Sequence, residues 1–194
     1  MVRKIRIPDS KDGWGYDLDD GVFARIDTDD GTVELHADEI NKYWPYVNSD
    51  DIEGISAWTN GKYVIVEFSV ASGQGGIVAI WNEKFELVHL SNAEFGITST
   101  LYDGYVYTLL VIKVYAHPLT YTMTRIPFGT MDAYTKEGLE HDESFEFLTD
   151  ELYKLSLKGK ILDLHVYEDS YKIVCGDDEF VIKRDPNSMV KGEE

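Results

Sequence analysis

The sequence predicts an all-β protein, and three observations lead to that prediction. Aromatic residues make up 13% of the 194 residues and include 13 Tyr, a residue type that favours strands and half-buried surfaces. Short runs rich in β-branched and aromatic residues follow a period of two, whereas helical periodicity is scarce. Turn signals that contain glycine separate these runs, and the chain holds 16 Gly against only 5 Pro.

The N-terminal half contains hairpin patterns. Asp29-Asp30-Gly31 is a strong turn signal between two apolar runs, and Asn82-Glu83-Lys84 separates a second pair. Asp38 to Trp44 is the one place in this half where a helix of one or two turns is expected. The predicted strands are Val22 to Asp27, Thr32 to His36, Lys62 to Val70, Gly76 to Trp81 and Phe85 to Leu90.

The C-terminal half begins with a long predicted strand, Tyr105 to Ala116. Both of its faces are mostly apolar, which indicates a strand covered on both sides. Met131 to Glu143 is polar and acidic and predicts a loop or a short helix. The remaining predicted strands are Leu119 to Ile126, Tyr153 to Lys158, Ile161 to Tyr167, Tyr171 to Cys175 and Glu179 to Lys183.

An internal repeat organises these strands. Gly54 to Val66 aligns with Gly96 to Tyr107 at an offset of 42 residues, and each copy has a short strand, a turn ending in Gly and a long strand. Weaker copies begin at Trp14 and Ile161, so units start near positions 14, 55, 97 and 162. The longest step holds a polar insertion near 129–144. Four units then account for a single all-β domain over residues 1–194.

The repeat resembles the blades of small β-propeller proteins. Ile77-Val78-Ala79-Ile80-Trp81-Asn82 followed by Phe85-Glu86-Leu87-Val88 is similar to the third and fourth strands of a blade. The resemblance covers architecture and implies a four-unit, propeller-like arrangement of antiparallel sheets that bury one another's faces. Val2 to Ile7 is expected to supply the outer strand of the last unit and close the ring. The alternative is a β-sandwich built of hairpins.

The charge excludes two classes of protein. The chain carries 18 Lys and Arg against 36 Asp and Glu, which gives a net charge of −18, and 43% of its residues are hydrophobic. The apolar content excludes a disordered chain, and the acidity excludes a nucleic-acid binder that works through a basic surface. No run is long and apolar enough for a membrane span. We expect a cytoplasmic protein whose single cysteine, Cys175, is a buried core residue.

Patterns that suggest chemistry have simpler structural interpretations. Asp27 to Glu34 approaches a calcium loop, but its third Asp and its Gly arrive one residue early, which favours an acidic hairpin turn. Asp163 and His165 share a strand face, as a carboxylate that orients a catalytic imidazole would, but a structural histidine is the favoured role. No histidine pair has zinc-type spacing. We expect no metal, no cofactor and no catalytic residue, although the sequence does not decide whether the protein is an enzyme.

Two loops carry the candidate binding residues. Aromatic side chains that flank a proline outside a strand can stack on a sugar ring or on a partner, although a hydrophobic plug is the alternative. A glycine-rich loop between strands, at Ala71 to Gly76, can contact a partner. The candidate binding residues are Tyr43, Trp44, Tyr46, Ser72 and Gln74.

These observations favour a non-catalytic module that recognises a protein partner through loops at one end of the fold. The negative charge favours a partner with a basic surface and opposes nucleic acid. One alternative is an acidic inhibitor or immunity-type protein that masks a basic enzyme such as a nuclease. A second alternative is a carbohydrate-binding or carbohydrate-active protein, for which Glu67 and Asp163 are possible acids.

Overall fold

The computed structural model describes most of the predicted strands. The described residues are 1–9, 18–43, 52–70, 76–92, 96–111, 121–132 and 161–184. The chain divides into two compact units, of which unit 1 comprises residues 1–94 and 129–138 and unit 2 comprises residues 95–128 and 139–194. The single domain with an insertion near 129–144 stays a prediction.

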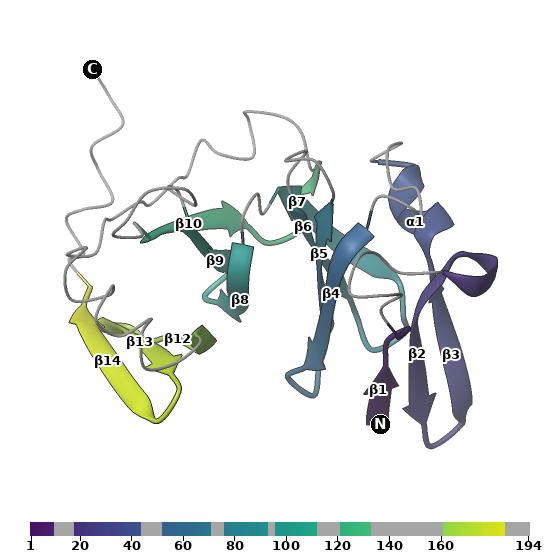
Figure 1. Cartoon of the computed structure of the whole chain (residues 1–194), viewed down its shortest axis with the longest axis horizontal. Coiled ribbons are helices and arrows are strands. Elements are labelled where there is room, and N and C mark those ends of the chain that lie inside the picture. Colours follow the sequence, from purple (N-terminus) through teal and green to yellow (C-terminus); the bar gives the residue numbers. More distant parts are fainter. Residues whose placement is uncertain are drawn as a thin grey trace. The chain divides into compact units, whose positions relative to one another are not determined.

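The first sheet of unit 1 is a three-stranded antiparallel meander. A single 3₁₀ turn, η1 (Asp19–Gly21), lies between its first and second strands in the chain, and a short helix, α1 (Ala37–Asn41), follows its third strand. The β2–β3 hairpin turns through Asp29 and Asp30, which confirms the predicted turn. The strands, in spatial order, are β1 (Val2–Arg6), β2 (Val22–Thr28) and β3 (Gly31–His36), as Figure 1 shows.

The place of β1 differs from the expectation. Val2 to Ile7 was expected in the last unit, but β1 pairs with β2 of the first sheet, with Ile5 opposite Ile26. Ion pairs accompany this pairing, because Arg6 contacts Asp27 at 2.6 Å and Arg3 contacts Asp29 at 2.5 Å. The first strand of the first sheet therefore precedes Trp14, where the repeat placed the start of the unit.

The second sheet of unit 1 is a four-stranded antiparallel meander with an additional short strand. β11 (Met131–Asp132) joins it parallel to its last strand, with Met131 opposite Leu90. A loop or short helix was expected at Met131 to Glu143. The expectation is wrong for Met131 and Asp132, which form β11, and residues 133–143 lie outside the described part. The meander consists of β4 (Ile52–Thr59), β5 (Val64–Val70), β6 (Gly76–Trp81) and β7 (Leu87–Asn92).

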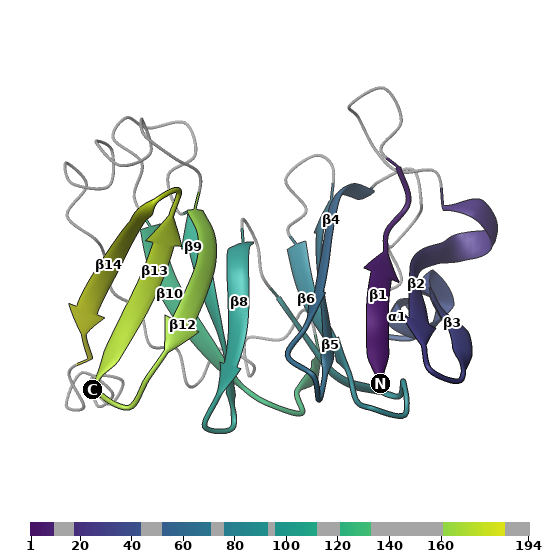
Figure 2. The same ribbon diagram turned by 90° about the horizontal axis from the view of Figure 1, so that it is seen from below.

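Unit 2 contains two three-stranded antiparallel meanders. The predicted strand Tyr105 to Ala116 is described as far as Val111, and Tyr153 to Lys158 lies outside the described residues. The first meander consists of β8 (Gly96–Tyr102), β9 (Tyr105–Val111) and β10 (Tyr121–Pro127). The second, yellow-green in Figure 2, consists of β12 (Ile161–Val166), β13 (Ser170–Cys175) and β14 (Asp178–Lys183).

The four described sheets share a β-bulge at the same place in their first strands. In the first strand of each sheet, the pairing register shifts by one residue at the second position of the strand. A bulge adds one unpaired residue and increases the local twist, so all four sheets begin with the same distortion. The extra residues are Arg3, Glu53, Ile97 and Leu162.

Aromatic side chains form the centre of the core of unit 1. Phe23 of β2 contacts Phe68 of β5 edge to face, with ring centroids 4.9 Å apart, and lies 5.4 Å from the ring of Trp81. Trp81 is fully buried, and its indole nitrogen donates a hydrogen bond to Glu39 of α1 at 2.9 Å. Ile40 is also fully buried, so the short helix closes one side of this core.

A tyrosine and arginine cluster joins the sheets of unit 2. Tyr107 and Tyr171 are buried, and their ring centroids lie 6.1 Å apart. Arg184, directly after β14, donates a hydrogen bond to the Tyr107 hydroxyl at 2.8 Å and lies over both rings at less than 6 Å. Cys175 is buried beside this core, as predicted, and its burial raises the pKa of the thiol.

The described residues confirm the all-β fold class and its four small antiparallel sheets. Apart from β11, each sheet is built from strands that follow one another in the chain, and the first strands of the second, third and fourth sheets begin near the predicted unit starts at 55, 97 and 162. The helix expected at Asp38 to Trp44 is shorter and ends at Asn41, where the Tyr43 amide donates to the Ile40 carbonyl at 2.9 Å.

Candidate functional site

A pocket of about 490 Å³ opens at one end of unit 1, where three hairpin turns meet. We call it the turn-end pocket. The turns are β2–β3, β4–β5 and β6–β7, and the beginning of β1 lies beside them. Its volume lies within the range of protein sites that hold a small molecule or an inserted side chain. The pocket is lined by Met1, Val2, Thr28, Asp30, Thr59, Gly61, Lys62, Tyr63, Val64, Asn82, Glu83, Lys84 and Phe85.

The β4–β5 turn is held by its own polar side chains. The Asn60 side-chain oxygen accepts hydrogen bonds from the amides of Lys62 and Tyr63, at 3.1 and 2.9 Å. The Thr59 hydroxyl donates to the Tyr63 carbonyl and accepts from the Gly61 amide. Gly61 adopts a φ of +89°, which glycine reaches without steric cost. The turn therefore presents Lys62 and Tyr63 in a fixed position.

The β6–β7 turn is organised in the same way by Asn82. Its side-chain oxygen accepts from the amides of Lys84 and Glu86, at 2.9 and 3.0 Å, and its side-chain nitrogen donates to the Glu86 carboxylate. Phe85 adopts a φ of +60°, which is costly for a residue with a side chain. Phe85 packs against the core of unit 1, and this packing offsets the backbone cost. The strand predicted from Phe85 therefore begins only at Leu87.

The β2–β3 turn completes the pocket. The Thr28 hydroxyl donates to the Gly31 carbonyl at 2.9 Å and accepts from the Asp30 amide at 3.2 Å. Hydrogen bonds from the Met1 amino group and from Arg3 lower the pKa of Asp29. The stretch that approached a calcium loop is thus a hairpin turn, as the spacing predicted, and its Asp29 carboxylate contacts the Met1 amino group and Arg3.

The side chains around the pocket combine apolar and charged groups. Tyr63 and Phe85 supply aromatic surface, and the Lys62 ammonium lies 5.1 Å from the centre of the Tyr63 ring. Lys62 and Lys84 carry positive charge, whereas Asp30 and Glu83 carry negative charge. Such a lining suits an occupant with an apolar body and a polar or charged end.

The predicted binding residues lie elsewhere or outside the described part. Tyr43 follows α1 and is 44% exposed, so its side chain is available at the surface. Trp44, Tyr46, Ser72 and Gln74 lie outside the described residues, and their role stays a prediction. The sequence does mark the turns of the pocket, through Asp29-Asp30-Gly31, Asn60-Gly61 and Asn82-Glu83-Lys84. It carries no signal that these three turns meet.

Asp163 and His165 form the predicted pair on one face of β12. The His165 ring nitrogen lies 3.3 Å from the Asp163 carboxylate, and about half of each side chain is exposed. His165 stands opposite Lys172 of β13, on an open sheet face. The Asp163–His165 pair is therefore a contact on the surface of the sheet. Among the described residues, no group of three or more His, Cys, Asp or Glu side chains is placed to hold a metal ion.

His89 is the buried histidine of unit 1, and sequence reasoning did not single it out. Its Nδ1 accepts a hydrogen bond from the Gly129 amide at 3.2 Å, which leaves the proton on Nε2. Nε2 then donates to the Ser91 hydroxyl at 2.8 Å. Burial lowers the pKa of His89 to about 4, so the ring is neutral at pH 7. His89 thus connects β7 to the segment that leads into β11.

Comparison with protein-family models, with curated proteins and with solved structures finds no match. Within the described residues, no helix has the length and apolar character needed to cross a membrane.

Proposed function

We propose that this chain is a non-catalytic binding module that recognises a protein partner through the turn-end pocket of unit 1. The observation that carries the proposal is a pocket of about 490 Å³ enclosed by three turns. The side-chain oxygens of Thr28, Asn60 and Asn82 accept hydrogen bonds from backbone amides of these turns and fix them before any partner arrives. A preorganised pocket loses less conformational entropy on binding than a mobile loop does.

The proposal includes a propeller-like arrangement of the four sheets. Its support is the succession of four meanders, each with a bulge at the second residue of its first strand. Repeated sheets of this kind place equivalent turns at a common end, where ring-like folds bind their ligands.

The charge indicates what kind of partner fits. A net charge of −18 attracts a partner with a basic surface over long range and raises the rate of encounter. At the pocket, Tyr63 and Phe85 contact an apolar stem, and Asp30 and Glu83 face a cationic end. An inserted lysine, arginine or aromatic side chain has this combination.

A capture experiment tests the proposal. The immobilised full chain is exposed to an extract of the organism that produces it, and the bound proteins are identified by mass spectrometry. Tyr63→Ala combined with Glu83→Lys removes an aromatic wall and reverses a charge at the pocket. We expect this variant to lose a captured protein by at least about tenfold, because one buried contact of this kind contributes more than 1 kcal/mol.

Two control variants make the result specific. Asp9→Lys changes the charge equally at an exposed position outside the pocket, and it is expected to retain the partner. Tyr43→Ala tests the loop that the sequence indicated. Capture that survives the pocket variant, or that is lost only with Tyr43→Ala, contradicts recognition by the turn-end pocket.

The two alternative functions stay predictions. In the first sheet, Arg25 contacts Glu34 at 2.8 Å, and Arg3 and Arg6 contact the aspartates of β2 and its turn, so this sheet does not present a purely acidic surface. The two possible catalytic acids belong to different units, Glu67 to unit 1 and Asp163 to unit 2.

A further inference from the structure

The strand β14 forms one edge of the second sheet of unit 2. In the described part of the chain, β14 has one neighbour, β13, which separates it from β12 (Figure 2). Val181, in the middle of β14, is 67% exposed, so its side chain is open to a partner at this edge. An edge strand presents unpaired backbone amides and carbonyls, which are a template for pairing with another strand.

The hydrogen bonds of the hairpin decide which groups of β14 face outward. The Arg184 amide donates to the Asp169 carbonyl at 2.8 Å, in register with the pairing of Tyr171 with Ile182. Because hydrogen-bonded pairs alternate along an antiparallel ladder, the backbones of Phe180 and Ile182 also bond toward β13. The amides and carbonyls of the intervening residues point away from β13. These residues are Glu179, Val181 and Lys183.

Two side chains of opposite charge flank Val181 at equal distances along β14. Glu179 lies two residues before Val181, and Lys183 lies two residues after it. All three are exposed and share the outer face of the sheet. An antiparallel copy of the same strand, centred on Val181, would place each Glu179 opposite the Lys183 of the other copy.

We propose that two copies of this chain associate through antiparallel pairing of their β14 strands about a two-fold axis at Val181. In this register each outward-facing residue stands opposite another outward-facing residue, so the pairing adds backbone hydrogen bonds without breaking those to β13. Val181 packs on its own equivalent, and Glu179 and Lys183 form two ion pairs. The result is one continuous six-stranded sheet with an isologous interface.

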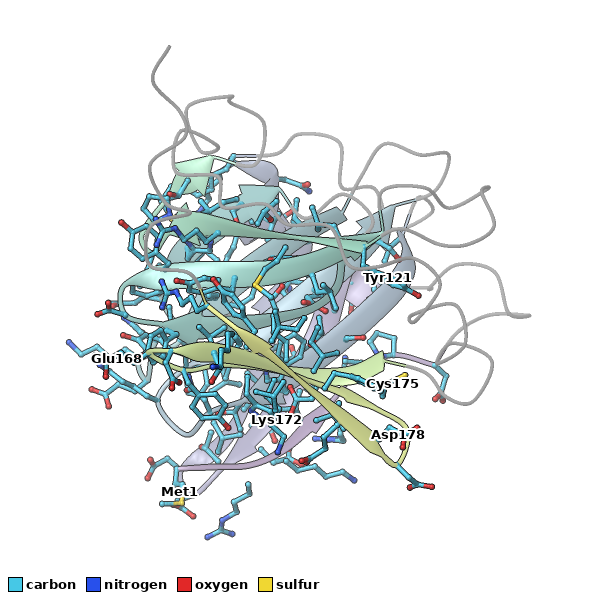
Figure 3. The ribbon with its side chains drawn as sticks, turned by 90° about the vertical axis from the view of Figure 1, so that its left-hand side faces the viewer. Met1, Tyr121, Glu168, Lys172, Cys175 and Asp178 are labelled. Atoms are coloured by element: carbon cyan, nitrogen blue, oxygen red, sulfur yellow. The ribbon has the colours of Figure 1, made fainter. Side chains whose placement is uncertain are left out.

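Neighbouring contacts are compatible with this pairing. Lys172 of β13 contacts one Glu179 carboxylate oxygen at 2.6 Å, which leaves the second oxygen for a lysine of the other copy. Figure 3 shows Lys172 near the middle of this sheet and Asp178 toward one end. Phe180 and Ile182 of the two copies stand opposite one another on the other face, where both side chains pack against the core of unit 2.

The small interface predicts a weak dimer. A single pair of six-residue strands is small beside the roughly 1,200 Å² of total surface that stable complexes bury. The net charge of −18 on each copy also opposes association, and salt screens this repulsion. We therefore expect a micromolar or weaker Kd at physiological ionic strength.

Sedimentation of the full chain across the micromolar range tests the proposal. We expect the wild type to shift from monomer to dimer as its concentration rises. Glu179→Lys places a lysine of each copy opposite the Lys183 of the other copy. This repulsion should weaken association by at least about tenfold. Glu179→Lys combined with Lys183→Glu restores opposite charges across the axis and should restore the dimer. Asp9→Lys, with the same charge change in unit 1, should not weaken it.

Cysteine cross-linking tests the register directly, in a Cys175→Ala background. Val181→Cys places two thiols opposite one another at a Cα separation of about 5.5 Å, within the reach of a disulfide. Lys183→Cys is the matched control, because its two thiols lie about 13 Å apart along the strands. We expect oxidation to link the first variant and not the second.

Three results would overturn the proposal. The first is a wild type that stays monomeric over the whole concentration range. The second is a dimer that the charge swap does not rescue, with all variants folded by circular dichroism. The third is equal cross-linking of the Val181→Cys and Lys183→Cys variants, which excludes an axis at Val181 even if the chain dimerises elsewhere.

Discussion

At the scale of single residues, His89 makes the stability of unit 1 depend on pH. Its folded-state pKa of about 4 lies below the ordinary value of 6.5. As the pH falls from 6.5 toward 4, the unfolded chain binds a proton at this histidine that the folded chain does not bind. The free energy of unfolding therefore falls on acidification, by up to about 3 kcal/mol from this residue. Urea unfolding between about pH 7.5 and 4.5 measures the effect.

Two variants separate His89 from the other titrating groups. His89→Gln removes the ionisable ring, so its free energy of unfolding should decrease less steeply between pH 6.5 and 4.5 than that of the wild type. His165→Gln removes a half-exposed histidine on β12 and is the matched comparison for the loss of one imidazole. If His89→Gln retained the full acid dependence, the buried neutral imidazole would not be its source.

At the scale of elements, a polar contact across the core links α1 to the second sheet of unit 1. The Trp81 indole donates to Glu39 at 2.9 Å, and Trp81 is fully buried. Glu39→Ala leaves this buried donor without its acceptor, which should lower the free energy of unfolding by about 1–2 kcal/mol. Glu39→Gln keeps an acceptor oxygen and should cost less. Urea denaturation of the three proteins measures the difference.

A double-mutant cycle assigns that cost to the contact. In a Trp81→Phe background the donor is absent, so Glu39→Ala should have little further effect. Asp38→Ala, at the neighbouring exposed position of α1, controls for the loss of a negative charge near the start of the helix. Equal costs for Glu39→Ala in both backgrounds would show that the carboxylate acts through the helix alone.

The sequence predicts strands well where they are locally encoded. Alternation and turn residues locate β6 at Gly76–Trp81, the β2–β3 hairpin and the three C-terminal strands. Pairing between distant segments is not locally encoded. β1 joins β2 through Arg6 and Asp27, and β11 joins β7 through two residues, because tertiary contacts decide these neighbours.

The candidate site shows the same limit. Asn60-Gly61 and Asn82 identify two of its turns in the sequence, but their meeting depends on how two sheets of unit 1 pack. The turn conformation at Phe85 could not be predicted from the sequence either, because phenylalanine rarely adopts a positive φ. Tyr43 is exposed as a surface candidate must be, although its predicted neighbours lie outside the described residues.

At the scale of the whole molecule, net charge opposes folding. The chain carries a charge of −18, so compaction brings like charges together in both units. Ion pairs act in the opposite direction, but exposed pairs such as Arg25–Glu34 and Lys172–Glu179 each contribute at most about 1 kcal/mol. Since 36 Asp and Glu repel one another and only 18 Lys and Arg can attract them, screening should remove more destabilisation than stabilisation.

We therefore expect the Tm of the full chain to rise as NaCl increases from about 20 to 300 mM, over which the Debye length falls below 10 Å. Differential scanning calorimetry at a fixed low protein concentration measures this rise without a contribution from dimer formation. Combining Asp9→Lys with Glu168→Lys reduces the net negative charge at two exposed positions, and this variant should gain less from salt. A Tm that falls with salt would instead show that the ion pairs between β1 and β2 and on the last sheet outweigh the long-range repulsion.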